Sequence, residues 1–600
     1  MVGILLIIST SIVFAACGGE YSSGDWDVTS SVSCSDETIT LDGNLSIHDG
    51  GNLIFDNITL EVNGNTDGIY GINVLSGGNL SVQNSNITNG NTVAAEFFFI
   101  VYDGSNFNMS SSYLSECGWS GTQGKRGLEI NTNDSYVNAN NFTNNFDGIY
   151  IYSDKNTISG NNVTHNNGKC IILDDAHNNT ISNNTIGYCN EGIHLIASNE
   201  NIIFNNTITK CDEGLQLEYS NNTLILYNTL IGPNVVQGIW ISSSKNNNII
   251  RNTIIDNTNI PGIQLDSNSY NNLIYDNSVI NNDVGIYLDS SYENMIFGNN
   301  LSLNLVAGIK LSSSYNNSIH NNTLTHEVDA ISLTSCDNNT LNNNEIDNSS
   351  RAVFLRDSDN NYITDSNITN GRSYDIYLRG TGDNIFLNST FNKSSIEFYA
   401  GSTGSITVKW YLDLYVNDTL GNNMSSTNVS LWDVTTNLIF SELTDSTGWI
   451  NKKNITEYVE SISGKTYHTN YTINVTKIGY DTDSSSLNIT KSIIKIVTLS
   501  DTTAPTLSLS LSDSSIKKSG SILISCSATD SQSGISSNSL TITKPSGESV
   551  SHNCNSYFTD TISTGTYTVT YSATDIDGNY ATRSTTFSVT SSTDYGGVLL

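Results

Sequence analysis

The stretch Asn179-Thr-Ile181-Ser-Asn-Asn184-Thr-Ile186 decides the fold, because variants of it recur along the chain at short, regular intervals. Self-similarity at a fixed period is typical of repeat architectures. A second phrase, Gly-Ile-any-Leu, lies between successive copies, for example at 192–195 and 285–288. Equivalents of Ile181 are spaced 22 to 25 residues apart, at positions 158, 181, 203, 225, 249, 274, 296, 319, 341, 363 and 385.

Each repeat predicts one turn of a solenoid. About 22 residues hold three short strands with their turns, which leaves too few for a helix in every unit. Aliphatic residues alternate with polar ones, so each strand is expected to be half buried. Stacked coils, with parallel strands ~4.8 Å apart, bury a continuous aliphatic column that one coil cannot bury alone. Ile274 and Ile296 should therefore be vertical neighbours, and upstream Leu53, Leu80 and Phe107 indicate longer coils of 27 residues.

One asparagine recurs at a fixed turn position of the repeat. Its amide both donates and accepts, so equivalent side chains can hydrogen-bond from coil to coil. Asparagine also tolerates the left-handed backbone of tight turns, and the repeated glycine indicates a bend where a Cβ would collide. The predicted ladder contains Asn161, Asn184, Asn206, Asn228, Asn252, Asn277, Asn299, Asn322, Asn344 and Asn388, with Ser366 as the exception.

These repeats resemble the right-handed parallel β-helix repeats of the pectate-lyase-like superfamily, in the style of NosD-like periplasmic or surface proteins. The resemblance covers roughly residues 40 to 395 and implies the fold more specifically than any activity. A NosD-like protein would imply copper, but soft copper sites need clustered Met, Cys or His. Here the nearest grouping is His165, His177 and His194, so we predict no metal site from them.

The chain is expected to be all-β, a right-handed parallel β-helix solenoid at 18–400 followed by two β-sandwich domains. Residues 401–500, with Trp410 and the turn at 444–449, resemble carboxypeptidase-regulatory-like sandwiches. Residues 501–590 resemble the immunoglobulin-like repeats of surface proteins, and 591–600 form a tail. Such domains usually act as spacers or adhesion modules.

The charge balance restricts the partners. Lys and Arg number 24 against 58 Asp and Glu, a net charge of −34. Nucleic acid is therefore excluded as an expected partner, because binding phosphate needs a basic surface. An anionic membrane surface is disfavoured for the same reason.

The first 17 residues predict an export signal, because an apolar run ends in small residues before Cys17. Cys17 is a candidate for lipidation, and no later stretch is apolar for the ~18 residues that a transmembrane helix needs. Export to the cell surface or beyond permits disulfides. We expect Cys526 to pair with Cys554, while Cys189 and Cys211, at matching repeat positions, form either a disulfide or a buried ladder.

The catalytic motifs of glycan-degrading β-helix enzymes match this sequence poorly. The Asp67 carboxylate of an Asn-Thr-Asp motif and the pair Asp174-Asp175 lie 107 residues apart, which is several coils. Carboxylates that flank one glycosidic bond must be within roughly 10 Å of each other. A better candidate is Asp266 with Asp289 on adjacent coils and Lys310 one coil further, which could bind Ca²⁺ or act as acid and base. The alternative is a solvated acidic face with one ion pair.

A carbohydrate platform is the second candidate site. Outward positions of the Gly-Ile-any-Leu strands carry aromatic rings with amides between them, and rings stack on sugars while amides bind hydroxyls. The alternatives are cross-strand packing and, for the arginines, ordinary solvated charge. The predicted contacts are Tyr150, Trp240, Tyr287, Phe354 and Tyr377, with the stacked pair Arg356 and Arg379 as a cradle for an anionic sugar.

The sequence thus favours an exported cell-surface β-helix with a structural or adhesive role that contacts carbohydrate. A polysaccharide lyase or glycoside hydrolase acting on acidic glycans is one alternative, and a NosD-like metal-accessory protein is another. No cofactor is expected, with Ca²⁺ as the sole candidate. About 27 Asn-any-Ser/Thr sequons would permit N-glycosylation in a host that performs it.

Overall fold

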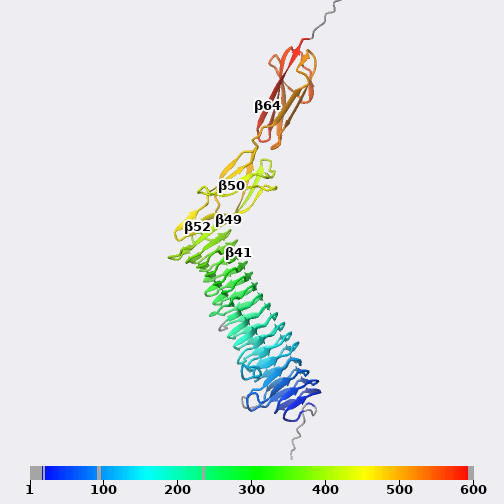
Figure 1. Ribbon diagram of the computed structural model, residues 1–600, viewed down its shortest axis with the longest axis vertical. Helices are drawn as coiled ribbons and strands as arrows, with labels where there is room; N and C mark the ends of the chain where they lie inside the picture. Colours follow the sequence, from blue (N-terminus) through cyan, green and yellow to red (C-terminus); the bar gives the residue numbers. More distant parts are fainter. Residues whose placement is uncertain (1–16, 18–20, 91–95, 233–236, 592–600) are drawn as a thin grey trace, which may run out of the picture. The chain divides into compact units, whose positions relative to one another are not determined.

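The computed structural model describes residues 17, 21–90, 96–232 and 237–591, and every regular element within residues 21–591 of this range is a β-strand. The chain divides into two compact units, one of residues 1–407 with 460–464 and one of 408–459 with 465–600. The first unit is a parallel β-solenoid, coloured blue to green in Figure 1. The prediction of an all-β chain that begins with a parallel solenoid is confirmed.

Each coil of the solenoid contributes one strand to each of three parallel sheets. A representative coil consists of β31 (Ile263–Asp266), β32 (Leu273–Tyr275) and β33 (Ser278–Ile280). We name the sheets that contain these strands sheet 1, sheet 2 and sheet 3. Sheet 2 begins at β2 (Ser31–Ser35) and sheet 3 at β3 (Thr38–Leu41).

Sheet 1 carries the Gly-Ile-any-Leu phrases and positions the candidate site. Its strands are β1 (Trp26–Val28), β4 (Leu45–Ile47), β7 (Gly71–Val74), β10 (Phe98–Val101), β13 (Leu128–Ile130), β16 (Ile149–Ile151), β19 (Ile171–Asp174), β22 (Glu191–Ile196), β25 (Glu213–Glu218), β28 (Gln237–Ser242), β31, β34 (Val284–Asp289), β37 (Ala307–Ser312), β40 (Asp329–Thr334), β43 (Arg351–Arg356), β46 (Tyr374–Arg379) and β48 (Ile396–Phe398).

Residues one repeat apart are vertical neighbours, as predicted. Ile274 of β32 pairs in register with Ile296 of β35 (Met295–Phe297), and both side chains are fully buried. The longer coils upstream also keep register, since Leu53 pairs with Leu80. The glycines are needed for close approach: a Cβ on Gly192 would lie 2.4 Å from the carbonyl oxygen of Gly214 on the next coil.

The last coil corrects one register assignment. Ile363 pairs with Phe386 of β47 (Asp383–Leu387), whereas Ile385 pairs with the outward Tyr362. Phe386 is fully buried and Ile385 is not. This coil is one residue longer than predicted, so the interior position moved from Ile385 to its aromatic neighbour.

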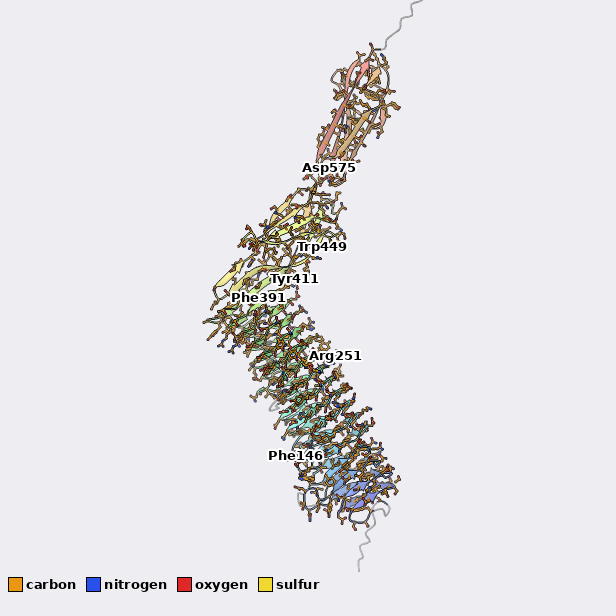
Figure 2. All side chains as sticks on the ribbon, in the orientation of Figure 1. Phe146, Arg251, Phe391, Tyr411, Trp449 and Asp575 are labelled. Carbon is orange, nitrogen blue, oxygen red and sulfur yellow. A yellow bond between two sulfur atoms is a disulfide. The ribbon has the colours of Figure 1, made fainter. Side chains whose placement is uncertain are left out.

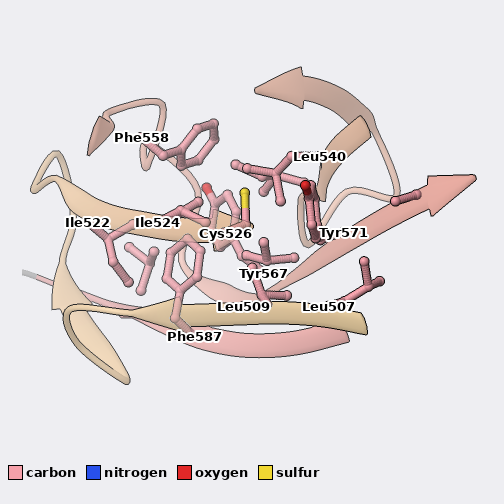
Figure 3. Close-up of a cluster of buried hydrophobic side chains, with 14 residues drawn as sticks. Leu507, Leu509, Ile522, Ile524, Cys526, Leu540, Phe558, Tyr567, Tyr571 and Phe587 are labelled. Carbon is pink, nitrogen blue, oxygen red and sulfur yellow. The ribbon is translucent and has the colours of Figure 1, made fainter. Parts of the chain in front are cut away.

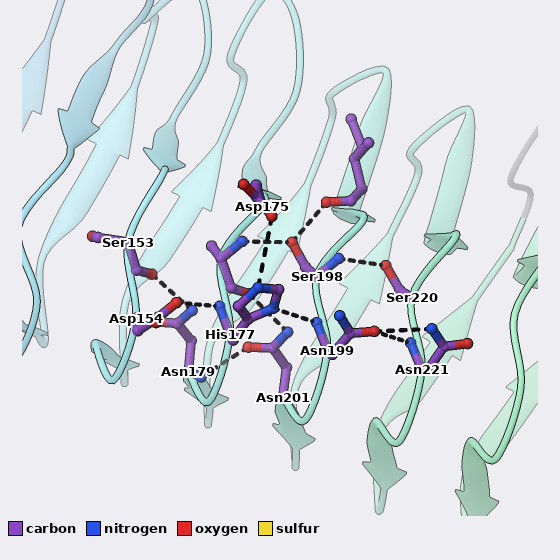
Figure 4. Close-up of polar contacts among 12 residues, drawn as sticks. Ser153, Asp154, Asp175, His177, Asn179, Ser198, Asn199, Asn201, Ser220 and Asn221 are labelled. Atoms are coloured by element: carbon purple, nitrogen blue, oxygen red, sulfur yellow. Dashed lines mark hydrogen bonds and ion pairs between the residues drawn. The ribbon is translucent and has the colours of Figure 1, made fainter.

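The asparagine ladder is confirmed at the turn between sheets 2 and 3. The Oδ1 of Asn277 accepts hydrogen bonds from the backbone N–H and the Nδ2 of Asn252, at 2.9 and 3.1 Å. Asn277 then donates through Nδ2 to Asn299 and to the backbone of Ile249. A second ladder at the turn between sheets 1 and 2 contains Asn179 and Asn201, which Figure 4 shows.

Two details of the predicted ladder are wrong. The left-handed backbone belongs to the residue before each rung, such as Asn183 with φ of 57°, and not to the rung itself. In addition, the N–H of Ser366 donates to the hydroxyl of Ser389, so Ser389 and not Asn388 is the final rung. Both follow from the turn geometry, in which an exposed left-handed residue turns the chain before the rung points inward.

The second unit contains antiparallel sheets. One joins β50 (Asn428–Trp432), β51 (Leu438–Leu443), β54 (Tyr471–Thr476) and β55 (Asp483–Leu487). Residues 506–590 form a three-stranded and a five-stranded sheet around a buried cluster that includes Tyr567 and Phe587 (Figure 3). Cys526 belongs to this cluster and forms a disulfide with Cys554, which packs against it.

The other cysteines give a mixed outcome. The Sγ atoms of Cys189 and Cys211 are 3.3 Å apart, so these residues are adjacent, but the disulfide of Cys189 is with Cys170. Cys17 forms a disulfide with Cys34, which occupies the sulfur that lipidation would need. The rest of the predicted export signal lies outside the described residues. In the part of the chain that the structure describes, no helix has the length and apolar character that a membrane crossing requires.

Candidate functional site

The outer face of sheet 1 gathers the ionic and aromatic side chains that the repeat leaves free to vary. Its central column runs in strict register, one residue per coil. The paired residues are Tyr150, Ile172, His194, Gln216, Trp240, Gln264, Tyr287, Lys310, Ser332, Phe354 and Tyr377. The predicted column of outward residues is therefore confirmed as a column.

A cavity of about 430 Å³ lies over β16, β19 and β22 on this face. The Arg126 guanidinium lies 3.6 Å from the centroid of the Tyr150 ring, and the Tyr150 hydroxyl donates to Asp174 Oδ2 at 2.8 Å. Tyr150 is only 4% exposed, so it offers no open ring face to a sugar and instead positions Asp174. The cavity is lined by Gly121, Arg126, Phe146, Asp147, Tyr150, Gly168, Lys169, Asp174, Asn190, Glu191 and Ile196.

An ionic chain continues from this cavity across the next strands. Glu191 Oε2 lies 2.7 Å from Lys169 Nζ and 2.5 Å from His194 Nδ1. His194 is 4% exposed, and its Nε2 is 3.9 Å from Glu218 Oε2. Burial opposes ionisation of Glu191, but the hydrogen bonds and positive charge of His194 and Lys169 outweigh it and lower the pKa of Glu191.

Other carboxyls on this face are held toward the neutral form. Burial, followed by the charge of Glu191, raises the pKa of Glu213 to about 7. Burial likewise raises the pKa of Asp147 and of Glu129. A carboxyl with a pKa near neutrality can donate a hydrogen bond or exchange a proton at physiological pH. The face thus offers both ionised and protonated oxygens.

Four coils from Tyr150, the indole of Trp240 is held in place by Asp266. Trp240 Nε1 donates to Asp266 Oδ2 at 2.8 Å, and Gln264 Nε2 donates to the same oxygen at 3.2 Å. Trp240 is half-buried. An immobilised indole between amide side chains is a chemical surface that suits a sugar ring and its hydroxyls.

The predicted catalytic trio is only partly brought together. Asp266 and Asp289 follow paired leucines, Leu265 and Leu288, and so lie on adjacent coils. Lys310 pairs instead with Tyr287, and its ammonium lies 4.8 Å from that ring's centroid. The Asp266 carboxylate already accepts hydrogen bonds from Trp240 and Gln264, so it belongs to the surroundings of the Trp240 ring.

The arginine cradle is a pair of stacked, exposed side chains. Arg356 and Arg379 occupy equivalent positions on adjacent coils. Arg379 lies 4.6 Å above the Tyr399 ring, and Arg356 lies 3.8 Å from Asp357.

Phe354 and Tyr377 lie beside this pair. Their rings are 5.5 Å apart with a tilt of 44°. The Arg351 guanidinium covers them, at 4.5 Å from the Phe354 centroid and 5.3 Å from that of Tyr377. It is fixed there by an ion pair with Asp329. These two rings are less open to a sugar than Trp240.

Sequence reasoning missed the most densely charged part of this face. Arg126, Asp147, Lys169, Glu191 and Glu213 each immediately precede the first residue of a Gly-Ile-any-Leu phrase or its equivalent. An alignment of the residue before the glycine reveals this charged column, in the same way that the residue two places after the glycine reveals the column from Tyr150 to Tyr377. The cavity itself depends on how the loop at 118–127 packs, which no periodicity encodes.

Three carboxyls gather in the second unit. The carboxylate oxygens of Asp501, Asp530 and Asp575 lie within 4.8 Å of one another. Backbone and side-chain donors engage them: Ser533 donates to Asp501 and Asp530, and Asn579 donates to Asp575. These contacts give the carboxyls a role in fastening the turns of this unit.

Comparison with known families bears on the fold. A family profile described as right handed beta helix region matches residues 147–302. The solenoid is a right-handed β-helix. A second profile, described as periplasmic copper-binding protein (NosD), matches residues 282–430 of this β-helix chain. None of the curated proteins compared with the chain matches it.

Solved structures that resemble the β-helix chain include three glycan-related enzymes. The periplasmic alginate epimerase AlgG is 14% identical, with 56% of this chain and 85% of that chain covered and a TM-score of 0.33. The A-module of the mannuronan C-5 epimerase AlgE6 from Azotobacter vinelandii is 14% identical, with 55% and 90% covered and a TM-score of 0.31. The DFA-IIIase from Arthrobacter chlorophenolicus A6 is 13% identical, with 51% and 84% covered and a TM-score of 0.29.

The His and Cys side chains of the NosD-matched segment can be located individually. Among its described residues, no three His, Cys, Asp or Glu side chains bring ligand atoms together. His320 stacks on Phe297 with centroids 4.8 Å apart, and Cys336 is fully buried with its Sγ donating to Thr334.

Proposed function

We propose that this β-helix is an exported surface protein that binds carbohydrate along the outer face of sheet 1. The observation that carries the proposal is the Trp240 indole, fixed by its hydrogen bond to Asp266 and flanked in register by the half-buried Gln264. A fixed aromatic ring stacks on a sugar at low entropic cost, while amides exchange hydrogen bonds with its hydroxyls.

The charge on this face favours a glycan without strong negative charge. Between β13 and β34, Arg126 and Lys169 are outnumbered by the carboxyls of this face: Glu129, Asp147, Asp174, Glu191, Glu213, Glu218, Asp266 and Asp289. Both cations already contact partners, since Arg126 lies on Tyr150 and Lys169 pairs with Glu191. A polyanionic chain would meet net repulsion here. We therefore place the ligand among neutral or weakly charged glycans.

The remaining features support a role at the cell surface. The net charge of −34 opposes nucleic acid as a partner, and the disulfides of Cys17, Cys170 and Cys526 suit an oxidising compartment. The sheets of the second unit would act as a spacer or adhesion module. In this proposal the solenoid displays its faces and the C-terminal part connects it to its surroundings.

The test compares Trp240→Ala with Trp449→Ala on a glycan array. Trp449, in the second unit, is 37% exposed and controls for loss of an accessible indole. We expect retention of at least one glycan by the wild type and Trp449→Ala, and at least a tenfold loss for Trp240→Ala. Equal retention by both variants would contradict the proposal.

Turnover of the bound glycan is a second candidate function. Glu213, with a pKa of about 7, lies beside the Glu191–His194 pair and could exchange a proton with a ligand. A reducing-end assay with Glu213→Gln and Asp289→Ala separates the alternatives. Loss of product only in Glu213→Gln would place an acid or base at Glu213, whereas loss only in Asp289→Ala would support the site of Asp266, Asp289 and Lys310.

A further inference from the structure

A second groove lies on another side of the solenoid, at the turn that joins sheets 2 and 3. Its volume is about 670 Å³. It extends over β9 (Asn86–Asn89), β12 (Tyr113–Ser115), β15 (Asn141–Thr143) and β18 (Asn162–Thr164). Its lining includes Asn57, Asn84, Asn86, Ser111, Tyr113, Ala139, Asn140, Asn141, Gly160 and Asn162.

The groove forms where smaller residues occupy one turn position on successive coils. At the turn between sheets 2 and 3, each coil has one exposed residue with a left-handed backbone. Along successive coils these residues are Asn84, Ser111, Ala139, Gly160 and Asn183. Three small residues therefore lie between two asparagines. The φ values, from 49° to 65°, show that the backbone is the same whether the side chain is large or absent.

The wall of the groove changes its chemistry over the same coils. Asn86, Tyr113, Asn141 and Asn162 pair in register at the first position of each sheet 3 strand. Beyond the groove this position becomes threonine, at Thr185 and Thr207. Amides and a phenol are thus concentrated where the turn residues are small.

The hydrogen-bonding groups here are not all used within the protein. Asn162 Nδ2 donates to Asn141 Oδ1 at 3.1 Å, whereas Asn141 Nδ2 and Asn162 Oδ1 make no hydrogen bond with the described residues. The only ionisable side chain of the lining is the phenol of Tyr113. Amide groups without charge match the alternating donors and acceptors of hydroxyls.

We propose that this groove binds an uncharged glycan that runs parallel to the solenoid axis. The strand repeat of ~4.8 Å is close to the length of one sugar unit, so successive sugars would meet equivalent amides on successive coils. The proposal does not rest on the Trp240 face, which belongs to sheet 1.

The decisive variant refills the groove with the residue that neighbouring coils already use. Ser111→Asn with Ala139→Asn places asparagine at left-handed positions equivalent to Asn84 and Asn183, so the fold should be kept. Asn205→Ala is the matched control, because it changes the same turn column outside the groove. Thermal unfolding of both variants verifies that they fold.

The experiment titrates protein from a host without N-glycosylation, since Asn86 and Asn141 begin sequons and an attached glycan could occupy the groove. The probes are uncharged hexasaccharides of β-1,4-glucan, β-1,4-mannan and α-1,4-glucan, with oligogalacturonate as the anionic comparison. We expect one neutral probe to bind the wild type, Asn205→Ala and Trp240→Ala, and to bind the refilled variant at least tenfold more weakly.

The proposal would be overturned by absence of binding of every neutral probe to the wild type, by equal binding to the refilled variant, or by equal binding of oligogalacturonate. Loss in Trp240→Ala alone would assign the binding to sheet 1 and reject the groove.

Discussion

The interior ladders and the outer face of sheet 1 are built from the same repeat but obey different constraints. Inside, residue identity hardly varies: Asn252, Asn277 and Asn299 make the same hydrogen bonds on successive coils. Outside, His194, Gln216 and Trp240 succeed one another in one column. Stacking fixes the inward positions, because each must fit the coil above and below, whereas outward positions accept different side chains that contact their neighbours, solvent or a ligand. Function is therefore to be sought where the repeat is broken.

The largest effect should come from truncating the aliphatic interior. Ile274→Ala removes a fully buried side chain, and such changes cost about 2–5 kcal/mol. Met295→Ala, at an outward and 43% exposed position on the next strand, should change stability by less than about 0.5 kcal/mol. Urea unfolding measures both. Equal losses of stability in the two variants would contradict the assignment of Ile274 to the interior and Met295 to the outer face.

The second-largest loss of stability should come from the asparagine ladder between sheets 2 and 3. Asn277→Ala removes the acceptor for two donors of Asn252, both buried, and each unsatisfied buried group costs about 1–3 kcal/mol. Asn248→Ala, exposed on the outer face of sheet 2, is the control and should be nearly neutral. A neutral outcome for Asn277→Ala would show that water or relaxation replaces the ladder.

A carboxyl rung, Glu327, allows the comparison to be tested through pH. Glu327 takes a place in a third ladder, where Asn304 donates to both of its oxygens, and burial raises its pKa to about 8. The folded state then holds the proton more tightly than the unfolded chain, whose value is 4.5. Stability should fall as pH rises from about 4.5 to 8.

Glu327→Asn tests this directly, because asparagine fills the equivalent rungs at Asn282 and Asn304. The variant should lose most of this pH dependence and be more stable than the wild type above pH 8. Parallel melting curves at pH 5, 7 and 9 provide the measurement. Unchanged pH dependence would mean that another group titrates in this window.

The sequence predicted the interior far better than the site. Ile274 and Asn277 could be placed because a 22-residue period leaves one way to stack them. The error at Ile385 arose because Phe386, also apolar, stands beside it in a coil of 23 residues. The sequence did not predict the cavity on sheet 1, because that cavity depends on which charged side chain packs on which aromatic ring. The sequence predicts Tyr150 as an exposed aromatic residue, but the Arg126 guanidinium covers its ring. Both residues line the same cavity as Phe146, which Figure 2 labels. The pairing of Cys170 with Cys189 joins non-equivalent repeat positions, so alignment of repeats could not find it.

Disulfide trapping at outward positions of sheet 2 tests the stacking most directly. Leu273 and Met295 face each other on adjacent coils, so Leu273→Cys with Met295→Cys should crosslink on mild oxidation and give a linked peptide by mass spectrometry. The pair Leu273→Cys with Phe297→Cys, two residues out of register, should crosslink much less. Equal or reversed yields would mean that residues one repeat apart do not lie above one another, and the columns on which every site here depends would not exist.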